Sequence, residues 1–134
     1  MNILFFLLPK SQVAYVLDDF TLRQTVEKLH YHHYTAIPVL DRKGKYLRTV
    51  SEGDILSYLT EHDGMDFKKA EDVSISDVQS SREILAIHSM ARMEDLYHLA
   101  LGQNFVPVTD DKGVFIGIVT RQSILKYYFS SQKN

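Results

Sequence analysis

Cysteine is absent from the 134 residues of this chain, and its absence excludes several classes of protein. Without thiols the chain cannot form a disulfide scaffold, a cysteine-ligated zinc site or a cysteine nucleophile. An excess of one charge is missing too, since the formal net charge is −2 and no stripe of Lys and Arg occurs. We therefore expect no binding to nucleic acid, which depends on such a basic surface.

A long hydrophobic run is also missing. The apolar stretch ILFFLL, residues 3–8, has six residues, no basic segment before it and no small-residue cleavage site after it. A membrane-spanning helix needs about 20 apolar residues, and a secretory signal needs the flanking features that this stretch lacks. The sequence therefore predicts a cytoplasmic protein that does not enter a membrane.

The chain does have a composition suited to a core, and it contains an internal repeat. It is 45% hydrophobic, with 8 Tyr and 7 Phe. TAIPVLDRKGKYLRTVSEGDILSYL (residues 35–59) aligns without a gap with NFVPVTDDKGVFIGIVTRQSILKYY (residues 104–128), 69 positions later. The residues of the first copy that are identical in the second are Pro38, Val39, Asp41, Lys43, Gly44, Val50, Ile55, Leu56 and Tyr58. We therefore expect one structural unit to occur twice.

The first copy predicts the order strand, helix, strand, strand, helix. The apolar run VAYV (13–16), matched by ILAI 71 positions later, predicts a buried strand. TLRQTVEKL (21–29) predicts a helix, in which Thr21 and Gln24 have capping-box spacing. AIPVL (36–40) starts an antiparallel hairpin, because the DRKG that follows has the Asp and Gly of a type I turn.

The second helix of the unit follows from SEGDILSYL (51–59), whose apolar residues share one helical face. The fold class predicted for the chain is therefore α/β (α+β), with two β-α-β-β-α repeats packed with pseudo-two-fold symmetry. We place the first repeat at residues 1–62 and the second at residues 79–134. The charged, weakly periodic residues 63–78 are expected to form a linker that contains one helical turn.

The doubled pattern resembles a tandem pair of cystathionine β-synthase (CBS) domains, often called a Bateman module. The resemblance rests on YTAIPVLD, GKYLRTVSEGDIL and QNFVPVTDDKGVFIGIVTRQSIL, and it covers nearly the whole chain. It implies that clefts between the repeats bind an adenine nucleotide or a related adenosyl compound. It also implies a stand-alone module that regulates a partner protein and performs no chemistry itself.

The ribose-contacting motif of this family is a Ser or Thr followed three residues later by Asp, and Ser51 and Asp54 match it. A carboxylate can accept hydrogen bonds from both hydroxyls of a ribose, and the helix start beyond Ser51 suits a phosphate. The same spacing is that of a capping box, in which both side chains bond only the helix backbone. The two roles are compatible because a carboxylate has two oxygens.

The second copy departs from the motif, because Thr120 is followed by Ser123 and not by an acid. A hydroxyl cannot accept from two ribose hydroxyls with the assistance of a charge. Either the second site is degenerate, or Arg121 binds a phosphate there through its planar guanidinium. A solvated surface charge is the alternative interpretation of Arg121.

Further contacts follow from the position of residues in the repeat, as the resemblance implies. The adenine is expected to lie against the backbone that leads into the second strand of each copy. These residues are Tyr34, Thr35, Ala36 and Ile37 in the first copy, and Asn104, Phe105 and Val106 in the second. Tyr34 would either stack on the base or simply pack. Candidate phosphate contacts precede each first strand: Lys10, Ser11, Ser81 and Arg82.

The histidines of HYHHY (30–34) suggest a metal site, but no Asp or Glu follows within the run at ligand spacing. We expect no metal there, and favour compensation of the dipole at the end of the first helix. Neither a Ser/His/Asp arrangement nor a P-loop nor a glycine fingerprint occurs, so we expect no catalytic residue, no enzymatic activity and no required cofactor.

Two functions remain. The first is a ligand sensor, for which AMP, ADP, ATP, S-adenosylmethionine and cyclic di-AMP are candidate ligands. The alternative is an interaction or dimerisation module with vestigial pockets. In either case a homodimer is expected, to which the helices carrying Ile55, Leu59, Ile124 and Tyr128 contribute. The apolar residues 3–8 would cover that interface or pack as the first helix or strand of the first repeat.

Overall fold

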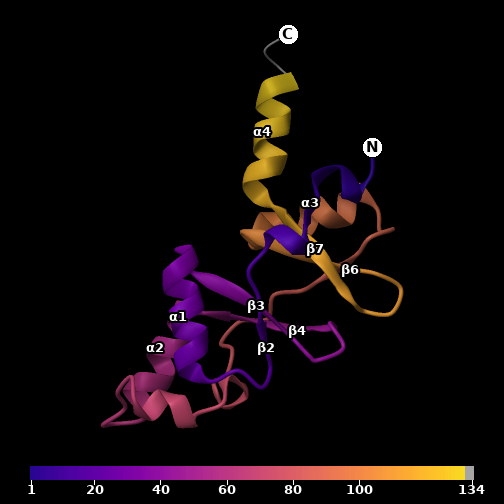
Figure 1. Ribbon diagram of the computed structural model, residues 1–134. Helices are drawn as coiled ribbons and strands as arrows, with labels where there is room; N and C mark the ends of the chain where they lie inside the picture. Colours follow the sequence, from indigo (N-terminus) through magenta and orange to yellow (C-terminus); the bar gives the residue numbers. More distant parts are fainter. Residues whose placement is uncertain (132–134) are drawn as a thin grey trace. The chain divides into compact units, whose positions relative to one another are not determined.

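The computed structural model describes residues 1–131 and contains the predicted order of elements twice (Figure 1). The first copy consists of β2 (Val16–Leu17), α1 (Leu22–His32), β3 (Ala36–Leu40), β4 (Tyr46–Ser51) and α2 (Glu52–Glu61). The second consists of β5 (Ile87–His88), α3 (Met93–Gly102), β6 (Phe105–Thr109), β7 (Phe115–Thr120) and α4 (Arg121–Ser131). The prediction of an α+β fold built from two β-α-β-β-α repeats is therefore confirmed.

Short elements precede each copy. The N-terminal segment contains the 3-10 helices η1 (Ile3–Phe6) and η2 (Lys10–Gln12), with β1 (Leu8–Pro9) between them. The segment between the copies contains the 3-10 helices η3 (Lys69–Asp72) and η4 (Ile75–Asp77). None of the helices within residues 1–131 is both long enough and apolar enough to cross a membrane.

Each repeat builds its own sheet. In the order β2-β3-β4, β2 is parallel to β3 and β3 is antiparallel to β4. In the order β1-β7-β6-β5, β5 is parallel to β6 and the other pairs are antiparallel. The hairpin turns form as the sequence predicts: Asp41 accepts hydrogen bonds at 2.9 Å from the amides of Lys43 and Lys45, and Gly44 takes a φ of 86°. Asp110 repeats this arrangement in the second hairpin.

The chain divides into two compact units that do not coincide with the two repeats. One unit is formed by Ala14–Glu83, and the other by Met1–Val13 together with the described residues from Ile84 onward. We call them the Asp54 unit and the Arg121 unit. In each unit, the segment that precedes one repeat packs on the other repeat. In Figure 1 the indigo N-terminal segment accordingly lies at β7, with which β1 pairs antiparallel.

The Asp54 unit includes the charged stretch that we predicted as a linker. Ile75 and Val78 of this stretch are completely buried in a core with Leu22, Ile37 and Val50. The stretch therefore contributes to the core of the unit, although Phe67 of the same stretch is 49% exposed.

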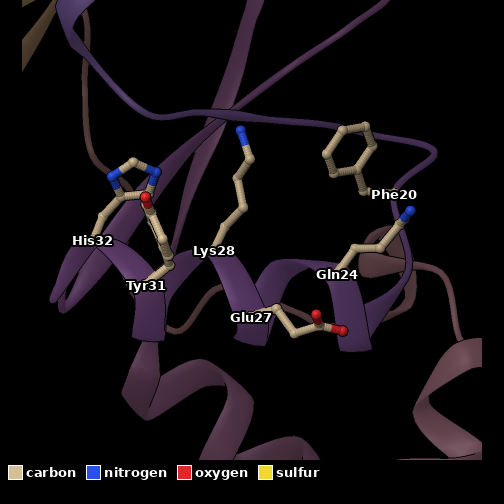
Figure 2. A pocket seen from close by; sticks show the side chains of 6 residues that line it. All are labelled: Phe20, Gln24, Glu27, Lys28, Tyr31 and His32. Atoms are coloured by element: carbon tan, nitrogen blue, oxygen red, sulfur yellow. The ribbon is translucent and has the colours of Figure 1, made fainter.

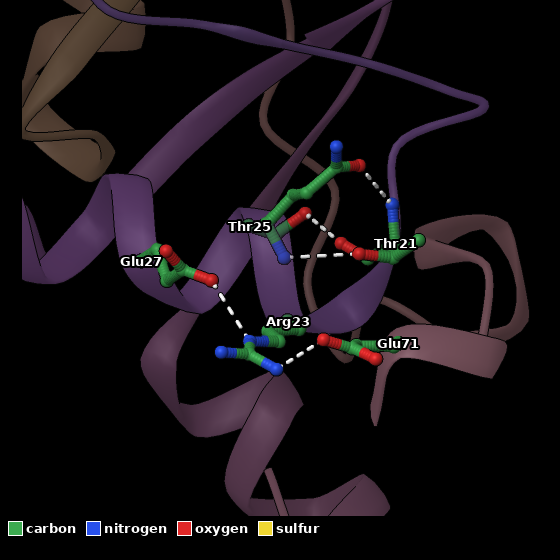
Figure 3. A network of polar contacts seen from close by, with 6 residues as sticks. Thr21, Arg23, Thr25, Glu27 and Glu71 are labelled. Atoms are coloured by element: carbon green, nitrogen blue, oxygen red, sulfur yellow. Dashed lines mark hydrogen bonds and ion pairs between the residues drawn. The ribbon is translucent and has the colours of Figure 1, made fainter. Parts of the chain in front are cut away.

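Polar contacts also hold this stretch to α1 (Figure 3). Thr21 and Gln24 form the predicted capping box, since each side chain accepts from the other residue's amide at 3.0 and 2.8 Å. In the same first turn, Arg23 forms ion pairs with Glu27 of the same helix and with Glu71 of η3. The start of α1 is thus fixed both locally and by the stretch that follows α2.

The Arg121 unit includes the apolar N-terminus. Ile3 is completely buried and Phe6 is 8% exposed, in a core with Leu96, Val106 and Val119. The expectation that residues 3–8 enter the first repeat is therefore wrong: they pack on the second. Their docking depends on Gly117, whose φ is 153°. A Cβ atom on this residue would lie 2.2 Å from the Leu8 carbonyl oxygen.

Candidate functional site

Ser51 and Asp54 form a complete capping box at the start of α2. The Ser51 hydroxyl accepts from the Asp54 amide at 3.1 Å, and the Asp54 carboxylate accepts from the Ser51 amide at 2.9 Å through Oδ2. Strand β4 runs directly into the helix, so Ser51 is both the last strand residue and the N-cap. The capping interpretation is thereby confirmed, and the ligand interpretation stays a prediction.

The second oxygen of Asp54 is bonded from a different part of the chain. Its Oδ1 accepts from both the amide and the hydroxyl of Ser81, each at 2.9 Å. Only 4% of the Asp54 residue is exposed. The carboxylate therefore accepts three hydrogen bonds and is almost covered, although it lies at a helix start.

These contacts decide the charge of Asp54. Burial raises the pKa of its carboxyl, but hydrogen bonds from Ser81 and Ser51 stabilise the charged form more strongly, so the pKa is lowered overall. Arg48 lies nearby, and burial lowers the pKa of its guanidinium while the charge of Asp54 opposes that shift. Asp54 is thus held as a carboxylate, the form that can accept hydrogen bonds from a ribose.

We expect the free energy of unfolding to decrease in acid through Asp54. Because the folded-state pKa is lowered, its contribution is complete above the ordinary pKa of 3.8 and is lost as the pH falls through the folded value. Denaturant unfolding of the wild type and of Asp54→Asn between about pH 7 and about pH 3 measures this. The difference between the two proteins should shrink below about pH 4, and a difference that is independent of pH would contradict the assignment.

The residues predicted to contact adenine in the first copy lie at the start of β3, next to Ser51. Ala36 pairs with Ser51 across the hairpin, and the Glu52 amide donates to the Thr35 carbonyl at 2.9 Å. Ile37 is completely buried. The registered pairs of β3 with β2 begin at Val39, which leaves the first residues of β3 without a β2 partner among the described residues.

Tyr34 bonds and packs within the Asp54 unit, whereas the stacking alternative would need its ring to face an adenine base. Its hydroxyl accepts from the Ala14 amide at 3.4 Å, and its ring packs against the core of the Asp54 unit. In the repeat alignment its counterpart is Gln103, which bonds the matching amide of Leu85 at 2.9 Å. The packing alternative for Tyr34 therefore agrees with its surroundings.

The second copy has no acid at the corresponding helix start. The Thr120 hydroxyl accepts from the Ser123 amide at 3.0 Å, and the Ser123 hydroxyl donates to the Thr120 carbonyl at 2.8 Å. Both side chains thus bond the helix backbone. The neighbouring residues Asn104, Phe105 and Val106 take the same place beside Thr120 as their counterparts in the first copy, since Phe105 pairs with Thr120.

Arg121 turns back onto the end of α3. Its Nε donates to the Ala100 carbonyl at 2.7 Å, Nη2 donates to the Leu101 carbonyl at 3.3 Å, and Nη1 donates to the Asn104 side chain at 3.1 Å. It therefore satisfies carbonyls at a helix C-terminus, where a cation is also favoured by the dipole. Binding of a phosphate by Arg121 stays a prediction. The alternative of a freely solvated charge does not agree with these three hydrogen bonds.

The other predicted residues lie apart. Lys10 lies in η2 of the Arg121 unit, which packs against β7, and Arg82 is an exposed residue at the end of the Asp54 unit. His30 and His32 lie in the last turn of α1, where they suit the dipole, and His33 is its left-handed C-cap. Within residues 1–131, no group of three or more His, Asp or Glu side chains is placed to hold a metal ion.

Two surface hollows lie in the Asp54 unit. One, of about 510 Å³, lies along α1 (Figure 2). Its lining consists of Phe20, Gln24, Glu27, Lys28, Tyr31 and His32, and Lys28 reaches across it to the Tyr15 carbonyl. The other, of about 350 Å³, lies beside Asp54 and includes Ser57, Tyr58, Ser80 and Ser81. Of the two, only the second reaches a predicted site residue.

Sequence reasoning missed two polar side chains that hold the site regions in place. Gln103 is 6% exposed, and its amide nitrogen donates to the carbonyls of Leu85 and Phe105. Arg48 donates to the carbonyls of Ile75 and Val78 at 2.7 and 2.6 Å. The repeat alignment pairs Gln103 with Tyr34, and this was the one signal that could have identified it.

The β-α-β-β-α unit occurs twice, as in the tandem CBS pair that the sequence resembles. The family model for the CBS domain matches the sequence at residues 7–61 and again at residues 75–130, and the chain therefore belongs to the CBS-domain family.

Similar proteins agree with this assignment. The sequence is 26% identical over 121 residues to cyclic di-AMP receptor B of Bacillus subtilis (strain 168), covering 90% of this chain and 82% of that protein. The CbpB protein of Listeria monocytogenes in complex with c-di-AMP is 27% identical, with a TM-score of 0.85 and coverage of 98% and 97%. A hypothetical conserved protein from Geobacillus kaustophilus is 27% identical, with a TM-score of 0.87 and coverage of 98% of both chains.

Proposed function

We propose that this chain is a cytoplasmic ligand sensor that binds an adenine nucleotide, cyclic di-AMP in particular, and regulates a partner protein without catalysing a reaction. Two observations together carry the proposal. The chain places a charged Asp54 at the helix start that follows its first hairpin, and it is 27% identical over nearly its whole length to a CbpB protein in complex with c-di-AMP.

The chemistry of the Asp54 unit supports this ligand class. The start of β3 offers backbone groups on its free edge, which suits a purine base. The first turn of α2 offers the positive end of a helix dipole, which suits a phosphate. Between the two lies the carboxylate of Asp54, the strongest acceptor for ribose hydroxyls. A base, a sugar and a phosphate are the three parts of a nucleotide.

Isothermal titration of the full chain with cyclic di-AMP and with AMP tests the proposal. Asp54→Asn should weaken binding by roughly tenfold or more, because hydrogen bonds to a charged group are worth roughly 1.5–3 kcal/mol. Asp41→Asn is the matched control: it makes the same change in the same unit, at a carboxylate that only fixes the hairpin turn. Equal weakening by both variants would show that Asp54 acts through stability alone.

A second function, that of an interaction module, is favoured because the polar side chains of the candidate sites already have hydrogen-bond partners. Asp54, Thr120, Ser123 and Arg121 all have partners within their own units. An interaction module with vestigial pockets would have this appearance. It is distinguished by thermal shift against AMP, ADP, ATP, S-adenosylmethionine and cyclic di-AMP: a sensor is stabilised by at least one of them. A chain that none of them stabilises at millimolar concentration is an interaction module.

A homodimer is part of both functions. On α2, Leu56 is 62% exposed and Leu59 is 39% exposed, and on α4 Phe129 is 64% exposed. We propose that these helix faces pair two copies of the chain. These are the helices that the sequence prediction named, although Ile55 and Ile124 themselves are buried in the cores of their own units. The exposed apolar residues are their neighbours.

A further inference from the structure

The contact between Ser81 and Asp54 lies at the group that the proposed function assigns to the ligand. Ser81 directs two donors, its amide and its hydroxyl, at one oxygen of the carboxylate. The other oxygen is bonded within the capping box. A ribose diol would direct two hydroxyl donors at the same carboxylate, so Ser81 presents the same chemistry as the ligand.

Ser81 and a ribose cannot bond Asp54 fully at the same time. A carboxylate accepts about four hydrogen bonds, and Asp54 already accepts three. With only 4% of the residue exposed, a fourth donor has little access. Ser81 also lines the hollow of about 350 Å³ beside Asp54, so its departure opens the carboxylate to that hollow.

We propose that Ser81 is an internal competitor of the ligand: it occupies the ribose position on Asp54 in the free chain, and nucleotide binding displaces it. This inference rests on the proposed function. It also assigns Ser81 a role opposite to the phosphate contact that the sequence suggests, because a competitor weakens binding and a contact strengthens it.

The neighbouring residues confine the displacement to a short segment. Ser80 is held by its hydroxyl, which donates to the Thr49 carbonyl at 3.1 Å and accepts from Arg48 at 2.9 Å. Three residues after Ser81, the chain passes at Ile84 into the Arg121 unit. Displacement of Ser81 therefore changes the last residues of the Asp54 unit, directly before the connection to the other unit. Occupancy of the site is in this way transmitted to that connection.

The contact of a serine with the carboxylate at the helix start occurs in the first copy and has no equivalent in the second. In the repeat alignment, Lys10 stands at the position of Ser81 and Ser123 at that of Asp54. Without a carboxylate, the second copy has no acceptor for which a serine and a ribose would compete. A ligand that bound at the second copy would therefore leave the Ser81 contact in place.

Two measurements on the full chain test the proposal. In the first, isothermal titration with cyclic di-AMP and AMP compares the wild type with Ser81→Ala and with Ser80→Ala. Ser81→Ala should bind one of these ligands roughly three- to tenfold more tightly, because one competing charged hydrogen bond is removed. Ser80→Ala loosens the same segment without freeing Asp54, and it should not bind more tightly.

In the second, amide hydrogen exchange by NMR compares the free and the ligand-saturated wild type. The Ser81 amide should lose protection when ligand binds, while the Ser51 amide, bonded to the other oxygen, keeps it. This measurement needs no variant, so it decides the question even if Ser81→Ala fails to fold.

The outcomes separate the two proposals. Binding by the wild type, with Ser81→Ala equal or weaker and the Ser81 amide still protected, overturns the competitor and leaves the proposed function intact. Absence of binding in the wild type and in Ser81→Ala overturns both. Binding that appears only in Ser81→Ala supports both, since the internal competitor then dominates in the wild type.

Discussion

Gly117→Ala is expected to detach the N-terminal segment from the Arg121 unit. The new Cβ would lie 2.2 Å from the Leu8 carbonyl oxygen and 2.9 Å from the Leu7 side chain, and the φ of 153° is one that residues with a side chain rarely adopt. The first of these contacts is with backbone, so no side-chain rotation relieves it. Strand β1, which pairs with β7 at this residue, must move away.

The expected loss of stability is large because Ile3 and Phe6 are lost from the core together with β1. Burial of one such side chain contributes about 1.5–3 kcal/mol, so the free energy of unfolding should fall by about 3–5 kcal/mol. Denaturant unfolding followed by circular dichroism measures the loss, and limited proteolysis should remove the N-terminal residues of the variant first.

Gly113→Ala is the matched control for this variant. Gly113 also has a positive φ, of 79°, but a Cβ there would meet nothing within 4 Å. Its cost is therefore conformational alone, about 1–2 kcal/mol. If the two variants lose the same stability and both keep the N-terminus protected, the close approach of β1 to Gly117 does not determine the docking of the segment.

The elements that sequence reasoning predicted correctly are those with local causes. The hairpin turns follow from an Asp that accepts from amides two and four residues later, and the helix starts of α1 and α2 follow from capping boxes. Each of these interactions spans at most four residues. The repeat alignment then predicts the same order of strands and helices in the second copy as in the first. The fold class could therefore be predicted without knowing any contact between residues far apart in the sequence.

The segments before each repeat could not be placed in the same way. Residues 3–8 are apolar throughout, which indicates burial but not the partner. Residues 63–78 are dominated by charge, so the two apolar residues that are completely buried, Ile75 and Val78, did not stand out. Which repeat receives each segment depends on contacts such as Gly117 with Leu8 or Arg48 with Val78, which join residues far apart in the sequence.

The candidate site shows the same division. The capping role of Ser51 and Asp54 could be predicted because it is local, whereas the bond from Ser81 to Asp54 spans 27 residues and leaves no pattern in one sequence. Arg121 was predicted to be a phosphate ligand or a solvated charge. Its partners in the structure are carbonyls at the end of another helix, about 20 residues away in the sequence, and no local pattern indicates them. For long polar side chains, residue type indicates the chemistry but not the partner.

Gln103→Leu is expected to destabilise the Arg121 unit about as strongly as Gly117→Ala, through a different cause. The side-chain amide of Gln103 bonds the amide and the carbonyl of Leu85 and the carbonyl of Phe105, at 2.9, 3.1 and 3.2 Å. It thereby ties the segment that leads into β5 to the start of β6. Leucine has a similar size but no polar atom, so these backbone groups lose a partner that is itself only 6% exposed.

Each buried polar group left without a partner costs about 1–3 kcal/mol, so the free energy of unfolding should fall by about 3–5 kcal/mol. Tyr34→Phe is the matched control, since Tyr34 takes the same position in the first repeat but makes one long bond, at 3.4 Å, to the Ala14 amide. Its loss should cost less than about 1 kcal/mol. Denaturant unfolding of both variants measures the two costs. A small effect of Gln103→Leu would mean that water satisfies the Leu85 and Phe105 groups, and that the packing of β5 and β6 does not need this side chain.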